Sequence, residues 1–116
     1  MKISKKNAEH YIWGKLCDGW HLAKSNELSI IHEKMPPHTT ENKHFHNKSK
    51  QFFFVLSGQA TIEVKDEMIL LNEHEGIEIL PNTPHQMMNN SSSDVEFLVI
   101  STPTSKGDRV VVDNDD

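Results

Sequence analysis

The sequence has one cysteine, no long apolar stretch and no excess of basic residues, and each absence excludes a class of protein. A single thiol, Cys17, cannot build an intramolecular disulfide framework or a cysteine-rich zinc site. No run approaches the roughly 18 apolar residues of a membrane span, and residues 1–6 are not followed by the apolar core of a signal peptide. We therefore expect a cytoplasmic protein with no membrane partner.

The charge balance bears on the binding partners. Seventeen acidic residues against 12 basic ones give a formal net charge of −5, whereas a dedicated nucleic-acid binder carries a basic patch or stripe. We therefore expect no nucleic-acid partner. Histidine is unusually frequent, with eight residues. Because paired thiols are absent, nitrogen and oxygen ligands would have to carry any metal chemistry.

Apolar residues recur with a period of two along most of the chain, which is typical of β-strands. No window carries a convincing amphipathic helix, and glycine, proline and asparagine punctuate the runs. The expected strands are 28–35, 51–56, 59–64, 68–71, 76–80, 85–88 and 95–100. Many short strands in 116 residues predict one all-β domain, a sandwich or a barrel.

The ends of the chain are weaker in pattern. Residues 1–24 are interpreted as an N-terminal arm of edge strands, whose aromatic side chains favour burial against the barrel or a second subunit. Residues 25–104 are expected to form the barrel. Residues 105–116 read as a polar C-terminal tail, and Asp113–Asp116 are expected to fray.

One segment gathers histidines around a point. His44 and His46 are two residues apart, so on a strand their rings lie on the same side. Gln51 begins the next strand after a short turn and is able to face back toward them. His85 begins a later strand, whose entry is fixed by two prolines. Three imidazoles and one side-chain oxygen inside a small barrel predict a site for one divalent metal.

These residues resemble the two motifs of the cupin superfamily. The first motif is glycine, five residues, His-x-His, three or four residues, glutamate, six residues and glycine. The second is glycine, five residues, Pro-x-Gly, two residues, histidine, three residues and asparagine. The matching positions are His44, His46, Gly58, His85 and Asn89. The departures are Gln51 at the glutamate position, and His38, His74, Leu80 and Asn82 at the glycine and proline positions.

The resemblance covers about residues 25–102 and implies a double-stranded β-helix, or jelly-roll, barrel. It also implies a metal bound by His44, His46, Gln51 and His85, with Fe, Mn, Ni, Co, Cu and Zn all open. Gln51 offers a neutral carbonyl oxygen instead of a carboxylate. Four neutral ligands should bind more weakly but leave the metal its full positive charge, which favours a Lewis acid. The alternative is a degenerate site on a barrel kept for another purpose.

The resemblance implies several functions. The first is a metalloenzyme similar to quercetin-dioxygenase-like cupins, acting on a small organic molecule. The second is a metal-dependent isomerase or lyase, in which a nearby histidine or glutamate moves a proton. The third is a non-catalytic module that binds a sugar or another small ligand, as the missing glutamate would allow. Many cupins dimerise through arm strands, so a homodimer is expected.

No catalytic residue is assigned from the sequence. Glu33 and Glu41 are candidate acids or bases only because they are near the motif. Glu63 and Glu78 lie in regular strands and are expected to face solvent. His32 and His38 are candidates for groups behind the metal ligands, with an ordinary surface position as the simpler interpretation.

Overall fold

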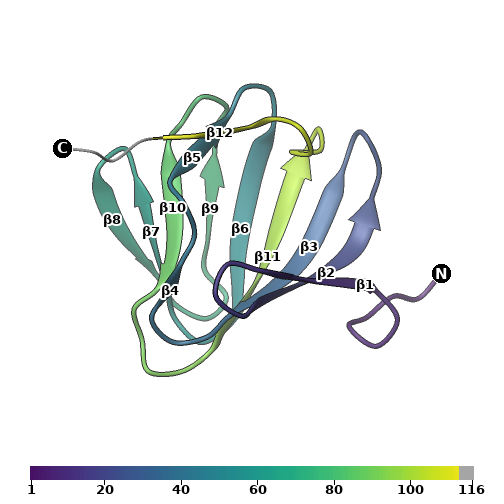
Figure 1. The fold of residues 1–116 in the computed structure, drawn as a ribbon, viewed down its shortest axis with the longest axis horizontal. Helices are drawn as coiled ribbons and strands as arrows, with labels where there is room; N and C mark the ends of the chain where they lie inside the picture. The colour runs from purple at the N-terminus through teal and green to yellow at the C-terminus, as the bar shows by residue number, and fades with distance from the viewer. Residues whose placement is uncertain (113–116) are drawn as a thin grey trace.

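The protein is represented by a computed structural model, which describes residues 1–112 and contains no helix in that range (Figure 1). The expectation for residues 113–116 lies outside the described residues. The strands are β1 (Glu9–Trp13), β2 (Cys17–Lys24), β3 (Ser29–Met35), β4 (Thr39–Thr40), β5 (His44–His46), β6 (Lys50–Ser57), β7 (Ala60–Val64), β8 (Glu67–Leu71), β9 (Gly76–Ile79), β10 (His85–Asn89), β11 (Val95–Thr102) and β12 (Arg109–Val111).

The strands form two antiparallel sheets that face each other. One sheet has the order β1-β2-β3-β11-β6-β9, and the other has the order β12-β5-β10-β7-β8, with β4 added to β10. Neighbours such as β3 and β11 are far apart in the sequence, which is the connectivity of a jelly roll. The predicted all-β jelly-roll barrel is confirmed.

Alternation along the central strands builds the core. In β11, Val95, Phe97 and Val99 are buried, and the residues between them are less buried. In β6, Phe53 and Val55 are buried while Phe52 faces outward. Since successive strand residues point to opposite faces, each strand gives one row of side chains to the space between the sheets. The apolar core consists of Cys17, Met35, Phe53, Val55, Ala60, Ile62, Leu71, Ile79, Met87, Val95, Phe97 and Val99.

Both ends of the chain extend these sheets. The segment 1–24, expected as an arm, carries β1 at the edge of one sheet and β2 beside it, and Cys17 of β2 is fully buried in the core. In its described part, the segment expected as a polar tail from residue 105 carries β12, which pairs with β5 directly beside the histidine motif. This strand is hard to recognise from local pattern because it is short and exposed.

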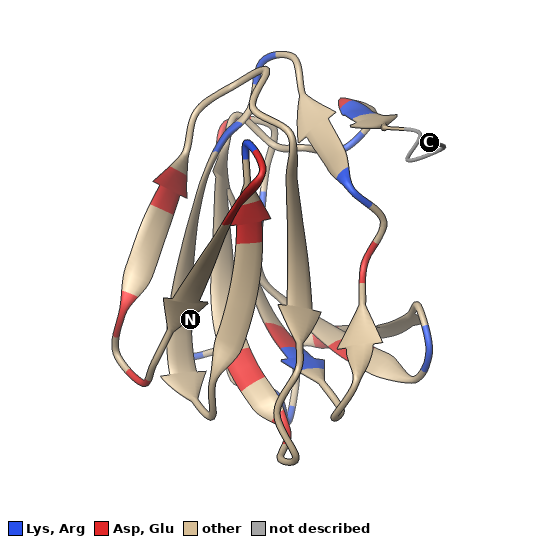
Figure 2. Cartoon of the chain, turned by 90° about the vertical axis from the view of Figure 1, so that its left-hand side faces the viewer, with Lys and Arg blue, Asp and Glu red and all other residues tan. Residues whose placement is uncertain are grey.

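Charged residues on the face seen in Figure 2 gather at strand ends and in turns, while the middles of the strands carry few. The space between the sheets is filled mainly by the apolar core and by the histidine cluster described next. Among residues 1–112 there is no helix that could cross a membrane.

Candidate metal centre

Three histidines meet between the sheets. His44 and His46 come from β5, and His85 is the first residue of β10, directly opposite His44 in the register of the two strands. The ring centroid of His44 lies 4.9 Å from that of His46 and 4.5 Å from that of His85. One nitrogen of each ring lies within 4.8 Å of the others, so this cluster could hold a metal ion.

Backbone carbonyls fix the orientation of all three rings. The Nδ1 atoms of His44, His46 and His85 lie 2.8, 2.9 and 2.9 Å from the carbonyl oxygens of Asn42, Asp108 and Thr83. A carbonyl only accepts, so each Nδ1 carries the proton and donates it. Each Nε2 therefore has a free lone pair, which is the arrangement that metal-binding histidines use.

Burial keeps these imidazoles neutral. It lowers the pKa of His44 to about 3 and lowers the pKa of both His46 and His85. Withdrawal from water disfavours the charged ring, and the neighbouring rings add to the effect for His44 and His85. Neutral imidazole is the form that binds a metal, so protons compete weakly for this site at neutral pH.

Gln51 faces the same point from the other sheet. Its Nε2 donates to Ser101 Oγ at 2.9 Å, which leaves Oε1 as the free end of the amide. Among the described residues, the buried Gln51 Oε1, His46 Nε2 and His85 Nε2 have no hydrogen-bond partner. All three are lone-pair acceptors, and leaving them unsatisfied costs free energy. A cation would satisfy all three at once, so the donor set fits a metal.

Asp108 supports the metal centre, and the sequence did not indicate it. Its carboxylate accepts hydrogen bonds from the backbone N–H groups of Asn47, Lys48 and Ser49 at 2.9–3.0 Å. These bonds lower the pKa of Asp108. Asp108 also accepts from His46 through its carbonyl, so one residue ties the β5–β6 turn to the ring orientation. This role of Asp108 depends on a contact with His46, which lies 62 positions away in the chain.

Two glutamates, Glu33 and Glu41, share a cavity of about 170 Å³ with His44, His46 and Gln51. Burial raises the pKa of Glu33 to about 8 and that of Glu41 to about 7, and the negative charge of Glu41 adds to the effect on Glu33. Glu33 Oε2 accepts from the Tyr11 hydroxyl at 3.0 Å. Glu41 Oε2 accepts from the backbone N–H of Met87 at 2.9 Å and lies 4.0 Å from His44 Nδ1. Two carboxyls with raised pKa values therefore line the cavity beside His44 and His46.

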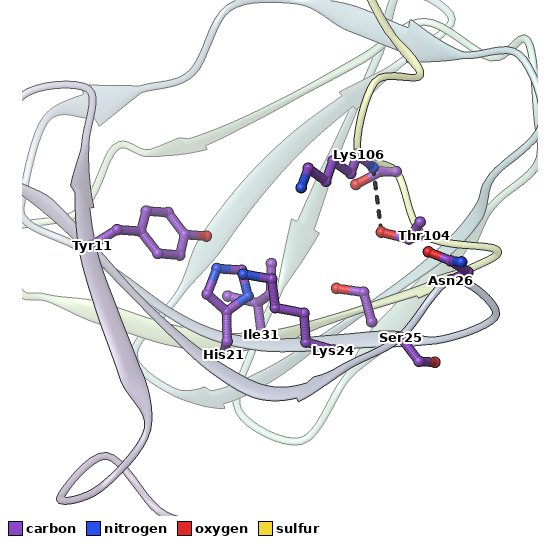
Figure 3. Close-up of a pocket in the computed structure, with 10 residues that line it drawn as sticks. Tyr11, His21, Lys24, Ser25, Asn26, Ile31, Thr104 and Lys106 are labelled. Carbon is purple, nitrogen blue, oxygen red and sulfur yellow. Dashed lines mark hydrogen bonds between the residues drawn. The ribbon is translucent and has the colours of Figure 1, made fainter.

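A second cavity adjoins the first on the side of β1 and β2. Its volume is about 450 Å³, and Tyr11, Ile31 and Ser105 line both spaces. We call the space around the histidines the inner cavity and this one the outer cavity. Figure 3 shows Tyr11, His21, Lys24 and Lys106 around the outer cavity, with the Tyr11 hydroxyl pointing into it.

The remaining sequence candidates lie away from this centre. His32 Nε2 is 2.7 Å from a Glu96 carboxylate oxygen, and Glu96 also accepts from Lys5, so this group belongs to the outer face of its sheet. His38 is exposed. The Glu63 carboxylate pairs with Lys43 at 3.0 Å, and Glu78 is exposed, so neither faces the inner cavity.

The fold and the site together define a small jelly-roll barrel with a histidine cluster that can hold a metal. The family model for the cupin domain, Cupin_2, matches residues 31–101. This chain therefore belongs to that cupin family, and the resemblance seen in the sequence is confirmed.

Relatives of known structure or name are distant. A protein named as an oxidoreductase from Arthrobotrys oligospora is 33% identical over 91 residues, which cover 78% of this chain but only 28% of that protein. A sugar phosphate isomerase from Silicibacter pomeroyi superposes with a TM-score of 0.77 at 17% identity, over 90% of this chain and 76% of that one. A predicted oxalate decarboxylase from Thermotoga maritima superposes with a TM-score of 0.82 at 15% identity, over 90% of this chain and 100% of that one. At such identities the two structures support the fold alone.

Proposed function

We propose that this protein is a metal-dependent enzyme that moves a proton on a small organic molecule, the chemistry of an isomerase or lyase. The observation that carries the proposal is the pair of glutamates with raised pKa values in the same cavity as His44 and His46, two of the three clustered histidines. Partly buried carboxyls with raised pKa values are costly to maintain and cluster at sites that transfer protons.

In this proposal His44, His46, His85 and Gln51 bind one divalent transition metal. The ion would act as a Lewis acid that polarises a carbonyl or hydroxyl oxygen of the substrate. The neutral Gln51 oxygen leaves the ionic charge intact, and the free Nε2 atoms of His46 and His85 supply ligands without a change of protonation.

The glutamates divide the work of an acid and a base. Because both carboxyls lie in one small cavity, a charge on one disfavours a charge on the other, which favours a state with one proton between them. Glu41, with the lower pKa, accepts the proton from a substrate carbon or hydroxyl. Glu33 keeps its proton and donates it to the substrate oxygen or carbon, while the Tyr11 hydroxyl holds its second oxygen in place.

Exchange with solvent deuterium tests this reaction class. Protein reconstituted with each divalent ion would be incubated in D₂O with small hydroxyketones, ketoacids and aldoses, and loss of carbon-bound protons followed by NMR. We expect exchange that Glu41→Gln slows by about 100-fold or more with metal content unchanged. Glu63→Gln, a half-buried glutamate outside the cavity, is the matched control. Unchanged exchange in Glu41→Gln would exclude the assigned role.

Metal analysis tests the ligand set separately. We expect His44→Ala and His85→Ala to lose the bound ion and His74→Ala to retain it, because His74 lies outside the cluster. Protein that holds no stoichiometric ion after reconstitution would overturn the enzymatic proposal. It would favour the non-catalytic module that binds a small ligand.

A dioxygenase is the second candidate function. Its support is the Arthrobotrys oligospora relative, which is named as an oxidoreductase and is 33% identical over the aligned region. The two candidates differ in their co-reactant. Oxygen consumption without carbon-proton exchange would favour the dioxygenase, and exchange under nitrogen would favour proton transfer.

A homodimer is also proposed. Ile12 and Leu16 are 60% and 75% exposed at the outer edge strand β1 and the turn that follows it. Burying them against a second copy would remove apolar surface from water. Light scattering should give twice the mass of 13.3 kDa, and Ile12→Lys should yield the monomer.

A further inference from the structure

We propose that the outer cavity binds an oxyanion group of the substrate, so that the enzyme acts on small organic anions. This inference rests on the proposed function and extends it from a reaction class to a substrate class. The reacting carbon would lie in the inner cavity beside the histidines. The carboxylate or phosphate would lie in the outer cavity, on the far side of Tyr11.

The first support is the charge of the lining. Lys24, at the end of β2, and Lys106, in the loop before β12, both border the outer cavity, and Figure 3 shows their side chains extending toward the same space. None of the ten described residues that line this cavity carries a carboxylate. The whole chain has a net charge of −5, so this cationic lining opposes the overall charge. Such a local field attracts and orients an anion.

Glu9 is the acidic group that competes for these lysines. Its Oε1 lies 3.2 Å from Lys24 Nζ, and the positive charges of Lys24 and Lys106 help to lower the pKa of Glu9. The pair is largely exposed, at 52% and 64% for the lysine and the glutamate, so it is held weakly and solvent screens it. An anion inside the cavity can replace this partner at small cost.

The second support is an unsatisfied polar atom. His21 lines the outer cavity, and its buried Nδ1 has no hydrogen-bond partner among the described residues. A buried polar atom without a partner costs free energy, and in the tautomer with the proton on Nδ1 this ring would donate to an oxyanion. Asn26, Ser29 and Thr104 add further amide and hydroxyl groups to the lining. The cavity therefore offers two cations and several hydrogen-bonding groups, which is what an oxyanion requires.

The third support is the size and continuity of the two spaces. The inner cavity, at about 170 Å³, is smaller than the roughly 300 Å³ at which ligand pockets usually begin. The outer cavity adds about 450 Å³ and shares Tyr11, Ile31 and Ser105 with it. A substrate that occupies both spaces would present its reacting atoms to the glutamates and its anionic end to the lysines.

Binding to the metal-free protein tests this inference independently of turnover. Isothermal titration would compare 4-oxopentanoate and glycerol 3-phosphate with their uncharged counterparts, 2-pentanone and glycerol. We expect binding of at least one anion, weakened by added salt, and no measurable binding of the neutral pair. The two anions distinguish a carboxylate from a phosphate site.

Substitutions define the position of the site. We expect Lys106→Met and Lys24→Met each to raise the dissociation constant of the bound anion about tenfold, which corresponds to about 1.4 kcal/mol, without changing metal content. Glu9→Gln should strengthen binding, because it removes the competing carboxylate. Lys15→Met, an exposed lysine in the β1–β2 turn outside both cavities, should change nothing.

Two results would overturn the inference: equal binding of charged and neutral probes, or lysine variants that bind the anion as well as the parent protein. Failure of the proposed function gives a different result. Protein that holds no metal yet binds the anion through Lys24 and Lys106 would retain this site and lose the enzymatic proposal.

Discussion

At the scale of single residues, the metal centre depends on which nitrogen of each histidine faces the cavity. The three Nδ1 atoms are occupied by backbone carbonyls, so the three Nε2 atoms are left for a ligand. Gln51 is held by a hydrogen bond from its amide nitrogen to Ser101. The three histidines that could hold a metal are therefore already oriented by the fold, which would lower the cost of ordering a metal site.

The residue that departs from the cupin motif, Gln51, gives the first prediction. Gln51→Glu should bind a divalent ion more tightly, by about tenfold or more, since a carboxylate adds a negative charge where the amide offers a neutral oxygen. Competition with a chelator would measure the affinity. Ser101→Ala is the companion variant, because it frees the amide to rotate and should weaken binding. Weaker binding in Gln51→Glu would mean that this side chain is not a ligand.

At the scale of elements, one row of residues connects the outermost strand with the inner cavity. Tyr11 of β1 is opposite Gly19 of β2, which in turn is opposite Glu33 of β3. The tyrosine ring lies over Gly19, where an added Cβ would come within 2.3 Å of it. The absent side chain is what allows the Tyr11 hydroxyl to reach across to Glu33.

This contact makes Gly19 a positioning residue for the cavity. Gly19→Ala should displace the Tyr11 ring and lower stability by roughly 1–3 kcal/mol, the usual cost of forcing an extra group into a packed position. Tyr11→Phe keeps the ring and removes only the hydrogen bond, so it separates the two effects. Thermal unfolding would measure both variants. Equal stability of Gly19→Ala and the parent protein would show that the ring has room to move.

The elements also show how much could be predicted from the sequence. Period-two patterning identified β6, β7 and β11, because each buries alternate residues, and the His-x-His spacing identified two of the clustered histidines. The role of Asp108 and the strand after it could not be predicted. They depend on pairing with β5, which is far away in the chain, and not on local pattern. The cavity around Glu33 and Glu41 could not be predicted either, because the two residues come together only when the barrel closes.

At the scale of the whole molecule, the buried groups oppose one another as the pH changes. Glu33 and Glu41 have folded-state pKa values raised from 4.5 to about 8 and about 7, so their stability contribution is present at acid pH and is lost as the pH rises through those values. The three clustered histidines have lowered pKa values, so the unfolded chain takes up protons below about pH 6.5 and the fold weakens there. The metal-free protein should therefore be most stable near neutral pH, above the range in which the unfolded histidines take up protons and below the range in which both glutamates ionise.

Removing the carboxyls of Glu33 and Glu41 should reduce the loss of stability at alkaline pH and leave the acid side unchanged. In chelator-treated protein, Glu33→Gln and Glu41→Gln should each raise the unfolding temperature at pH 9 relative to the parent, with a difference that shrinks toward pH 5. After partial contact with water is allowed for, each is worth up to about 2 kcal/mol. Glu27→Gln, an exposed glutamate outside both cavities, is the control and should follow the parent. A constant difference across the pH range would show that the gain comes from packing, and the two carboxyls would then not be the groups that titrate between pH 5 and pH 9.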